Sequence, residues 1–266
     1  EDIIDDDTPN KHQAAKRSTW ISVAVNIVLT ITQLIAGVFS HSQGLIADAI
    51  HSLSDLIADF VVLFANHHSQ KDADQDHPYG HQRFETAASL VLGVLLLGVG
   101  VGMLWSAFRK LEDPDSVQTV HGVALWVAGV ALVSKELLFR YMLAVAKRVK
   151  SSMLVANAWH ARSDAASSLV VALGIVGNLL GYPILDPIAA SLVGFMVAKM
   201  GWGFGWSALH DLMDRAVDEQ EVEAIRCTLA ETPGVQGVHD VRTRKMGDMI
   251  VVDAHIEVDA TLSVEA

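Results

Sequence analysis

Six long apolar stretches constrain the fold of this chain more than any other feature. Each has the length of roughly 20 residues that a helix needs to cross the hydrocarbon core of a bilayer. The stretches cover residues 19–40, 44–66, 85–108, 119–143, 153–180 and 184–208. Of the 266 residues, 51% are hydrophobic and only 19% are charged, which is unlike a soluble domain of this length. The sequence therefore predicts an α-helical membrane protein with six transmembrane helices in a lipid bilayer.

The chain divides into a tail, a membrane region and a polar region. These segments are residues 1–17, 18–208 and 209–266. In the polar region, residues 218–232 read as an amphipathic helix, and residues 238–245 and 249–258 alternate like two strands. This order predicts a partial α+β domain. One helix on two strands is too small to bury a stable core alone, so we expect the natural domain to be longer or to lean on a partner.

Basic residues gather in the tail and in two of the connections between apolar stretches. They are Lys11, Lys16, Arg17, Lys71, Arg83, Lys147, Arg148 and Lys150. The positive-inside rule assigns these segments to the cytoplasm. Arg109 and Lys110 oppose this assignment, but acidic residues follow them immediately. Because six is an even number of spans, we expect both termini to be cytoplasmic.

Charge and cysteine content argue against nucleic-acid binding and against structures built on cysteine. The net charge of −12 argues against nucleic acid as a partner. The single cysteine, Cys227, excludes an internal disulfide and a thiolate-rich metal site.

Two predicted membrane helices carry the same pair of metal-binding residue types. His51 and Asp55 lie four residues apart in the second stretch, and His160 and Asp164 lie four residues apart in the fifth. Residues at this spacing share one helix face. Two such faces brought together offer two nitrogen and two oxygen ligands, a set suited to tetrahedral Zn²⁺. The sequence therefore predicts an intramembrane site for a divalent metal ion.

The energetics of the bilayer favour this interpretation. An Asp near the centre of a membrane helix costs about 2.5–3.5 kcal/mol, so it normally faces a partner or a water-filled cavity. The alternative is that each pair makes a satisfied polar contact between helices, but its repetition on two spans argues against this. Asp48, three residues before His51, could support the site or form part of an ion pathway.

Two weaker clusters lie outside the apolar stretches. Asp74, His77 and His81, between the second and third stretches, could form an exposed metal site or simply a solvated acidic loop. His239 and His255 lie on the two predicted strands, where a metal site across the strands is possible. Isolated surface histidines would give the same pattern.

Three motifs together resemble the cation diffusion facilitator family. They are the repeated H-x-x-x-D in the second and fifth of six spans, the loop D-x-D-H-P-Y-G-H-x-R-x-E over residues 74–85, and the L-M-D-R segment over residues 212–215. The similarity covers nearly the whole chain from about Ser18. It implies a homodimeric membrane protein with a ferredoxin-like cytoplasmic domain, which exports a divalent metal ion from the cytoplasm in exchange for protons.

The resemblance also implies roles for individual residues. The implied transport site is His51, Asp55, His160 and Asp164. The implied loop site is Asp74, His77 and His81, and His239 and His255 match part of a cytoplasmic metal cluster. Arg83, Asp214 and Arg244 match positions of a charge interlock between the membrane and cytoplasmic domains.

We therefore expect a transporter rather than an enzyme, with Zn²⁺ as its cargo, in the inner (plasma) membrane of a bacterium. Family members with two Asp residues in the second span also handle iron or cadmium, whereas His51 favours zinc. An alternative is that the same mechanism exports iron, manganese or cadmium. Two alternatives come from other classes. One is a membrane-embedded metal sensor or scaffold, and the other is an intramembrane zinc hydrolase, for which the chain lacks an H-E-x-x-H motif.

Overall fold

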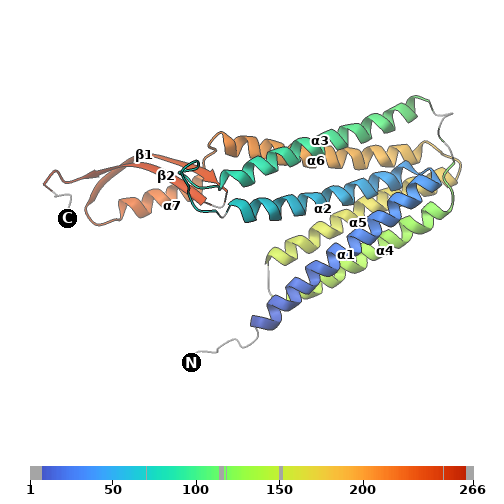
Figure 1. Cartoon of the computed structure of the whole chain (residues 1–266), viewed down its shortest axis with the longest axis horizontal. Helices are drawn as coiled ribbons and strands as arrows, with labels where there is room; N and C mark the ends of the chain where they lie inside the picture. The colour runs from blue at the N-terminus through green and yellow to red at the C-terminus, as the bar shows by residue number, and fades with distance from the viewer. Residues whose placement is uncertain are drawn as a thin grey trace. The chain divides into compact units, whose positions relative to one another are not determined.

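The described part of the chain forms seven helices and a two-stranded hairpin (Figure 1). The computed structural model describes residues 8–69, 71–113, 117, 119–149, 152–247 and 249–261. The elements are α1 (Thr8–Ser40), α2 (Gln43–Ser69), α3 (Arg83–Glu112), α4 (Val123–Val149), α5 (Ser152–Leu179), α6 (Leu185–Leu212), α7 (Glu219–Ala230), β1 (Val235–Met246) and β2 (Met249–Val258). Residues 1–58 and 96–200 form one compact unit, and residues 59–95 and 201–266 form a second.

Each predicted apolar stretch coincides with one of the helices α1 to α6. Among the described residues, three helices are long and apolar enough to cross a membrane: Arg17–Ser40, Arg83–Glu112 and Leu185–Leu212. The other long helices, α2, α4 and α5, carry charged residues inside the segment, including Asp48, Lys135 and Asp164. Length and composition thus support three spans, and the six-span topology stays a prediction.

Small residues allow the helices of the first unit to approach closely. A Cβ atom added at Gly174 would lie 2.6 Å from the Cβ atom of Ala189, and one added at Gly100 would lie 2.4 Å from the backbone of Ala198. Such close approach is typical of helix packing in membranes. Helix α4 also packs against α5 and α1, which lie beside it (Figure 1).

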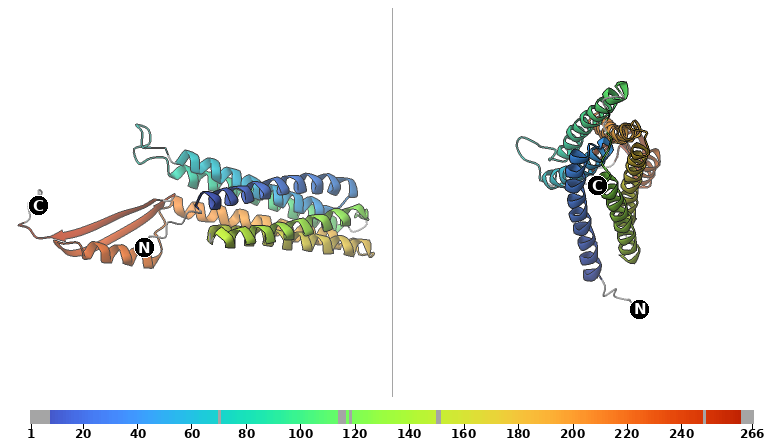
Figure 2. Two further views of the ribbon diagram at one scale, coloured as in Figure 1. Left: turned by 90° about the horizontal axis from the view of Figure 1, so that it is seen from below. Right: turned by 90° about the vertical axis from the view of Figure 1, so that its right-hand side faces the viewer.

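In the second unit, α7 packs against the antiparallel hairpin of β1 and β2 (Figure 2). The predicted apolar stripe of α7, Val222, Ile225 and Leu229, is half-buried, and the helix fully buries no residue. On β2, Ile256 and Val258 are exposed. The helix–strand–strand order is therefore as predicted, and this layer leaves apolar surface uncovered.

Candidate metal sites

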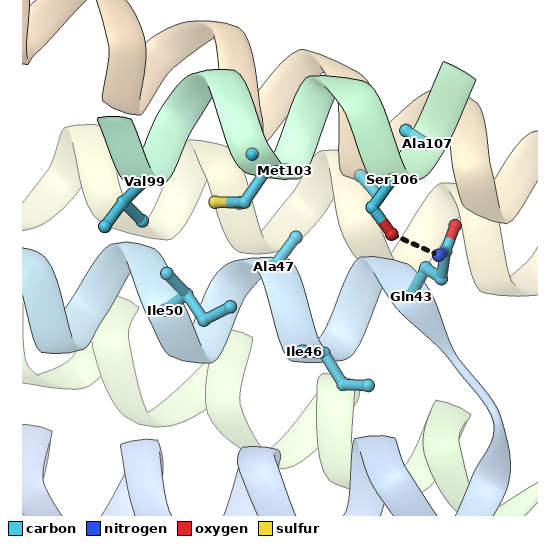
Figure 3. A pocket seen from close by; sticks show the side chains of 10 residues that line it. Gln43, Ile46, Ala47, Ile50, Val99, Met103, Ser106 and Ala107 are labelled. Atoms are coloured by element: carbon cyan, nitrogen blue, oxygen red, sulfur yellow. Dashed lines mark hydrogen bonds between the residues drawn. The ribbon is translucent and has the colours of Figure 1, made fainter. Parts of the chain in front are cut away.

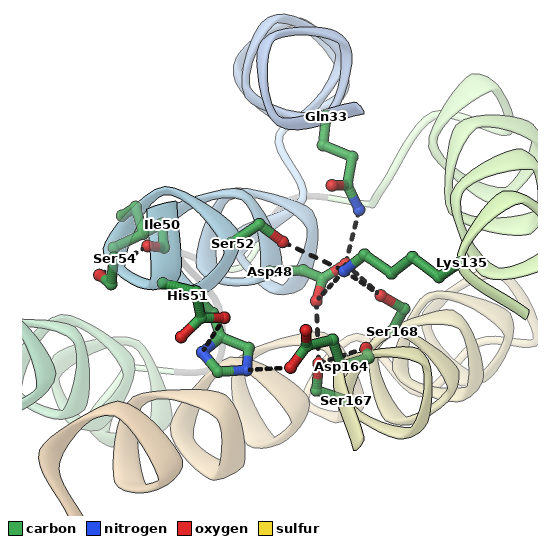
Figure 4. Close-up of polar contacts among 11 residues, drawn as sticks. Gln33, Asp48, Ile50, His51, Ser52, Ser54, Lys135, Asp164, Ser167 and Ser168 are labelled. Carbon is green, nitrogen blue, oxygen red and sulfur yellow. Dashed lines mark hydrogen bonds and ion pairs between the residues drawn. The ribbon is translucent and has the colours of Figure 1, made fainter. Parts of the chain in front are cut away.

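The structure brings together three of the four residues predicted for the intramembrane site. His51 lies between two carboxylates, with Nδ1 at 3.7 Å from Asp55 Oδ2 and Nε2 at 3.8 Å from Asp164 Oδ1 (Figure 4). One ligand atom from each residue lies within 4.8 Å of the others. His51 is 5% exposed and both carboxylates are half-buried. We call His51, Asp55 and Asp164 the transport cluster.

His160, the fourth predicted residue, lies outside this cluster. It is one helical turn before Asp164 on α5, and its side chain is exposed. The second H-x-x-x-D motif thus brings its carboxylate against His51, whereas its imidazole stays outside the cluster.

A buried cation beside the transport cluster was missed by the sequence analysis. Lys135 of α4 is 2% exposed, and its Nζ lies 3.3 Å from Asp48 Oδ2 on α2. The sequence had indicated for Asp48 only a supporting role beside the metal site or a place in an ion pathway. The available signal was Lys135 itself, because a lysine in the middle of a long apolar helix needs a partner.

The N-terminus of α2 is anchored by a second buried carboxylate. Asp186, at the start of α6, accepts hydrogen bonds from Ser42 Oγ (2.7 Å) and from the backbone N–H of Gln43 (2.7 Å). These contacts satisfy backbone donors that the first turn of a helix leaves unpaired. Asp186 therefore ties α2 to α6 and fixes the helix that carries His51 and Asp55.

The predicted loop residues form a cluster in the second unit, in which Asp74 and His77 are exposed and His81 is half-buried. Asp74 lies between the two imidazoles, with its oxygens 3.5 Å from His77 Nδ1 and 3.5 Å from His81 Nε2. The backbone N–H groups of His77 (2.7 Å) and Asp76 (3.0 Å) donate to Asp74 Oδ1. The first of these bonds, helped by the nearby imidazoles, holds the pKa of Asp74 below its usual value of 3.8. The carboxylate is therefore ionised at neutral pH and available as a ligand. We call these three residues the loop cluster.

The two strand histidines face each other, as the predicted strands required. His239 pairs with His255 across the hairpin, and the ring centroids are 5.2 Å apart. Asp240, which the sequence analysis did not select, joins them: its Oδ2 lies 3.3 Å from His255 Nδ1 and 3.6 Å from His239 Nδ1. The register of the hairpin is irregular between His239 and Arg242, and Asp240 has a left-handed φ of 53°. This bulge turns the Asp240 carboxylate towards the histidines, which strict strand alternation does not predict.

Arg83, Asp214 and Arg244 also come together within the second unit. Arg83 Nη2 lies 2.5 Å from Asp214 Oδ1, and Arg244 Nη1 lies 3.8 Å from Asp214 Oδ2. The cluster links the start of α3, the residues just after α6 and strand β1. These ion pairs join α3 and the residues after α6 to strand β1 of the hairpin.

One cavity in the first unit is lined by neither carboxylates nor imidazoles. It has a volume of about 340 Å³ and lies between α2, α3 and α6 (Figure 3). Its lining residues are Gln43, Ile46, Ala47, Ile50, Val99, Gly102, Met103, Ser106, Ala107 and Ala190. The cavity therefore lacks the charged and imidazole ligands that zinc sites use.

Comparison with known proteins identifies the family. The cation efflux transmembrane domain matches residues 19–213, and the cytoplasmic domain of cation efflux proteins matches residues 217–266. Metal tolerance protein 2 of Oryza sativa subsp. japonica is 36% identical, over 96% of this chain and 72% of that protein. The manganese efflux system protein MneS of Bacillus subtilis and the magnetosome protein MamB of Magnetospira sp. are each 34% identical, over 92% of this chain and 83% of the relative. The chain belongs to the cation diffusion facilitator family, whose members are divalent metal cation efflux transporters and not enzymes.

Proposed function

We propose that this protein exports a divalent transition metal ion, foremost Zn²⁺, from the cytoplasm in exchange for protons. The observation that carries the proposal is the position of His51 between Asp55 and Asp164, on two different helices and largely out of contact with solvent. One imidazole and two carboxylates are ligands that zinc accepts. Two acidic side chains drawn together away from water also need a cation or protons to balance their charge.

His160 completes the ligand set in this proposal. It lies one turn from Asp164 on α5, so a change of its side-chain rotamer is the movement that would bring a second imidazole to the ion. A metal ion in the site would favour that rotamer, because it forms a bond with the neutral imidazole. The exposed His160 would then act as the first residue that a metal ion meets.

Exchange with protons follows from the chemistry of the ligands. A protonated imidazole or carboxyl group cannot bind a metal ion through the protonated atom, so metal and protons compete for one site. A proton that returns down a membrane potential of 100 mV supplies about 2.3 kcal/mol. If the site opens alternately to the two sides of the membrane, this energy can drive metal outwards.

The proposed topology has six spans, with both termini in the cytoplasm. Lys71 between α2 and α3, and Lys147 and Arg148 in the last turn of α4, support it through the positive-inside rule. In α2 and α5 the charged side chains of the transport cluster contact each other, which is how charged residues are tolerated inside a bilayer. The loop cluster and the hairpin would then both be cytoplasmic. A bacterial inner membrane is the proposed location, and residues 18–208 and 209–266 are the proposed membrane and cytoplasmic domains.

The proposal assigns accessory roles to the exposed clusters. The loop cluster and the cluster of His239, Asp240 and His255 each offer three ligand groups within 4.8 Å. Both lie on segments that the topology assigns to the cytoplasm, where they would bind metal before transport. The match to the cytoplasmic domain and the exposed apolar residues of β2 support a homodimer that forms through this domain. Asp214, with Arg83 and Arg244, would hold the membrane helices to that domain.

The choice of metal has one specific competitor. A relative that is 34% identical over most of its length is named for manganese efflux. Carboxylates suit Mn²⁺, whereas imidazoles favour Zn²⁺. The buried imidazole at the centre of the transport cluster favours zinc, and two imidazoles would favour it further.

Metal uptake by proteoliposomes tests this proposal. We expect His51→Ala to lower zinc uptake at least ~100-fold, because the residue that joins both carboxylates is lost. His121→Ala is the matched control, since His121 is exposed and belongs to none of the three described metal clusters. The same assay with zinc, cadmium, manganese and ferrous iron ranks the cargo. Wild-type uptake by the His51 variant, or binding of metal without uptake by the wild-type protein, would refute the transport role.

A further inference from the structure

A buried polar cluster surrounds the ion pair of Lys135 and Asp48. Nζ of Lys135 donates to Ser168 Oγ (2.7 Å) and to Ser52 Oγ (3.1 Å). Ser168 Oγ donates to Asp48 Oδ2 (2.6 Å), as does Gln33 Nε2 (2.5 Å). Four helices, α1, α2, α4 and α5, thus meet at one ion pair (Figure 4). We call Gln33, Asp48, Ser52, Lys135, Ser167 and Ser168 the Lys135 cluster.

The Lys135 cluster forms the next layer along the helices from the transport cluster. Asp48 precedes His51 by three residues on α2, which is about 4.5 Å along the helix axis. Ser168 follows Asp164 by four residues on α5, and it contacts Asp48. The two helices therefore run in opposite directions here. Both place this layer on the side of the N-terminus of α2, which the proposed topology assigns to the outside.

Beyond the Lys135 cluster on that side, the helices are closed by an apolar core. Its buried members are Leu45, Ala47, Val120, Ala124, Ala128, Val171, Ile175, Ala190 and Val193. On the opposite side of His51, Asp55 is half-buried and His160 is exposed. The Lys135 cluster and this core thus cover the transport cluster towards the N-terminus of α2, while the cavity of about 340 Å³ lies on the α3 and α6 side of that helix. Towards the C-terminal end of α2 the transport cluster reaches the surface.

We infer that the Lys135 cluster is the outer closure of the transport pathway, and that it separates when the site opens to the outside. This inference rests on the proposed function and topology. A buried ion pair adds little net stability relative to the same ions in water, because its attraction is offset by lost hydration. Water entering from outside can therefore replace these contacts at low net cost. A closure made only of apolar side chains would expose apolar surface when it opens.

The same physics predicts what happens when one partner is removed. Without Lys135, the Asp48 carboxylate would be left charged and unpaired in the closed layer, which is strongly unfavourable. Hydration of the carboxylate then favours the open arrangement. Exchange of the two charges restores a pair in the same place. Single variants should hold the pathway open to the outside, and the exchanged pair should close it again.

Labelling of a cysteine placed in the apolar core measures the closure directly. In a Cys227→Ser background, Ala128→Cys puts a thiol at a site that is 2% exposed, and Val171→Cys offers a second such site. Full-length protein in liposomes is treated with a membrane-impermeant maleimide on the outer face. We expect Lys135→Met to speed labelling at least ~10-fold, and the double variant Asp48→Lys with Lys135→Asp to return it towards the parent rate. Glu136→Gln is the control, because it removes an exposed ion pair from the same helix.

Zinc binding and zinc uptake separate a closure from a merely structural support. A closure predicts that Lys135→Met lowers uptake at least ~10-fold while the zinc affinity changes less than ~3-fold. Equal loss of binding and uptake, or unchanged labelling at both cysteines, overturns the inference. Failure of the proposed function would give a different pair of results, which leaves the closure itself intact. In that case His51→Ala leaves zinc uptake intact, while labelling still follows the Lys135 variants.

Discussion

The transport cluster and the loop cluster are built from the same residue types but differ in burial. Side-chain exposure is 6%, 15% and 17% for His51, Asp55 and Asp164. In the loop cluster it is 54% for Asp74 and 60% for His77, and only His81 is as buried as Asp164, at 17%. Water can balance the charge of the exposed group, whereas the buried group needs a cation or protons. The comparison teaches that burial, rather than the kind of ligand, makes a cluster suited to exchange of metal for protons.

The test with the largest expected effect removes one carboxylate charge from each cluster. We expect Asp164→Asn to lower zinc uptake at least ~100-fold, because the buried site loses both a ligand and the charge that attracts the ion. We expect Asp74→Asn, which makes the same change in an exposed loop, to lower uptake less than ~5-fold. Uptake by liposomes with equal protein content is the measurement. Equal losses in both variants would show that burial does not distinguish the clusters.

A second test concerns pH at the loop cluster, and it is expected to be smaller. The pKa of Asp74 is lower in the folded protein than in the unfolded chain, so the ionised carboxylate stabilises the loop at every pH above the unfolded-state pKa. This stabilisation is lost only as the pH falls below about 4. Between pH 7 and 5 the carboxylate therefore stays charged. A change of zinc affinity at this cluster over that range therefore does not come from protonation of Asp74.

Zinc titrations of the full chain can verify this. The variants His51→Ala and His239→Ala, combined, remove the other two clusters. In that background we expect the affinity to fall at least ~10-fold from pH 7 to pH 5. Asp74→Asn should lower the affinity at every pH and leave the slope unchanged. A flatter slope in the Asn variant would mean that Asp74 itself takes up protons in this range.

Features set by neighbouring residues in the sequence were predicted well, whereas contacts between distant residues were not. Helices and strands follow local periodicity, so the apolar stretches and the hairpin were located within a few residues, apart from the earlier start of α1 at Thr8. The H-x-x-x-D spacing likewise put His51 and Asp55 on one helix face. Contact of Lys135 with Asp48 could not be predicted in this way, because 87 residues separate them.

The hairpin of β1 and β2 shows one contact that local patterns predict and one that they do not. Pairing of His239 with His255 follows from two strands joined by a short turn, and the structure has this pairing. Asp240 joins the pair only because the register slips at a bulge, and a bulge inserts a residue that strict alternation assigns to the other face. The signal that could have identified it was an acidic residue adjacent to a histidine on a strand.

The smallest expected effect is at the exposed charge cluster around Asp214. Its side chain is 45% exposed, and that of Arg83 is 43% exposed, so water screens their attraction. We expect Asp214→Asn to lower the free energy of unfolding by about 0.2–1 kcal/mol, and by less in high salt. Asparagine is the suitable replacement because Asp214 has a left-handed φ of 60°, which asparagine also tolerates.

Thermal unfolding of the full chain at low and high salt checks this expectation. Glu223→Gln is the control, since it removes a longer exposed ion pair (3.8 Å) within α7 and should change the unfolding temperature even less. A loss of stability in Asp214→Asn that persists unchanged in high salt would point to packing or backbone conformation rather than charge. A loss well above about 1 kcal/mol would mean that this exposed cluster behaves like a buried one, and burial would then not explain the contrast between the two regions.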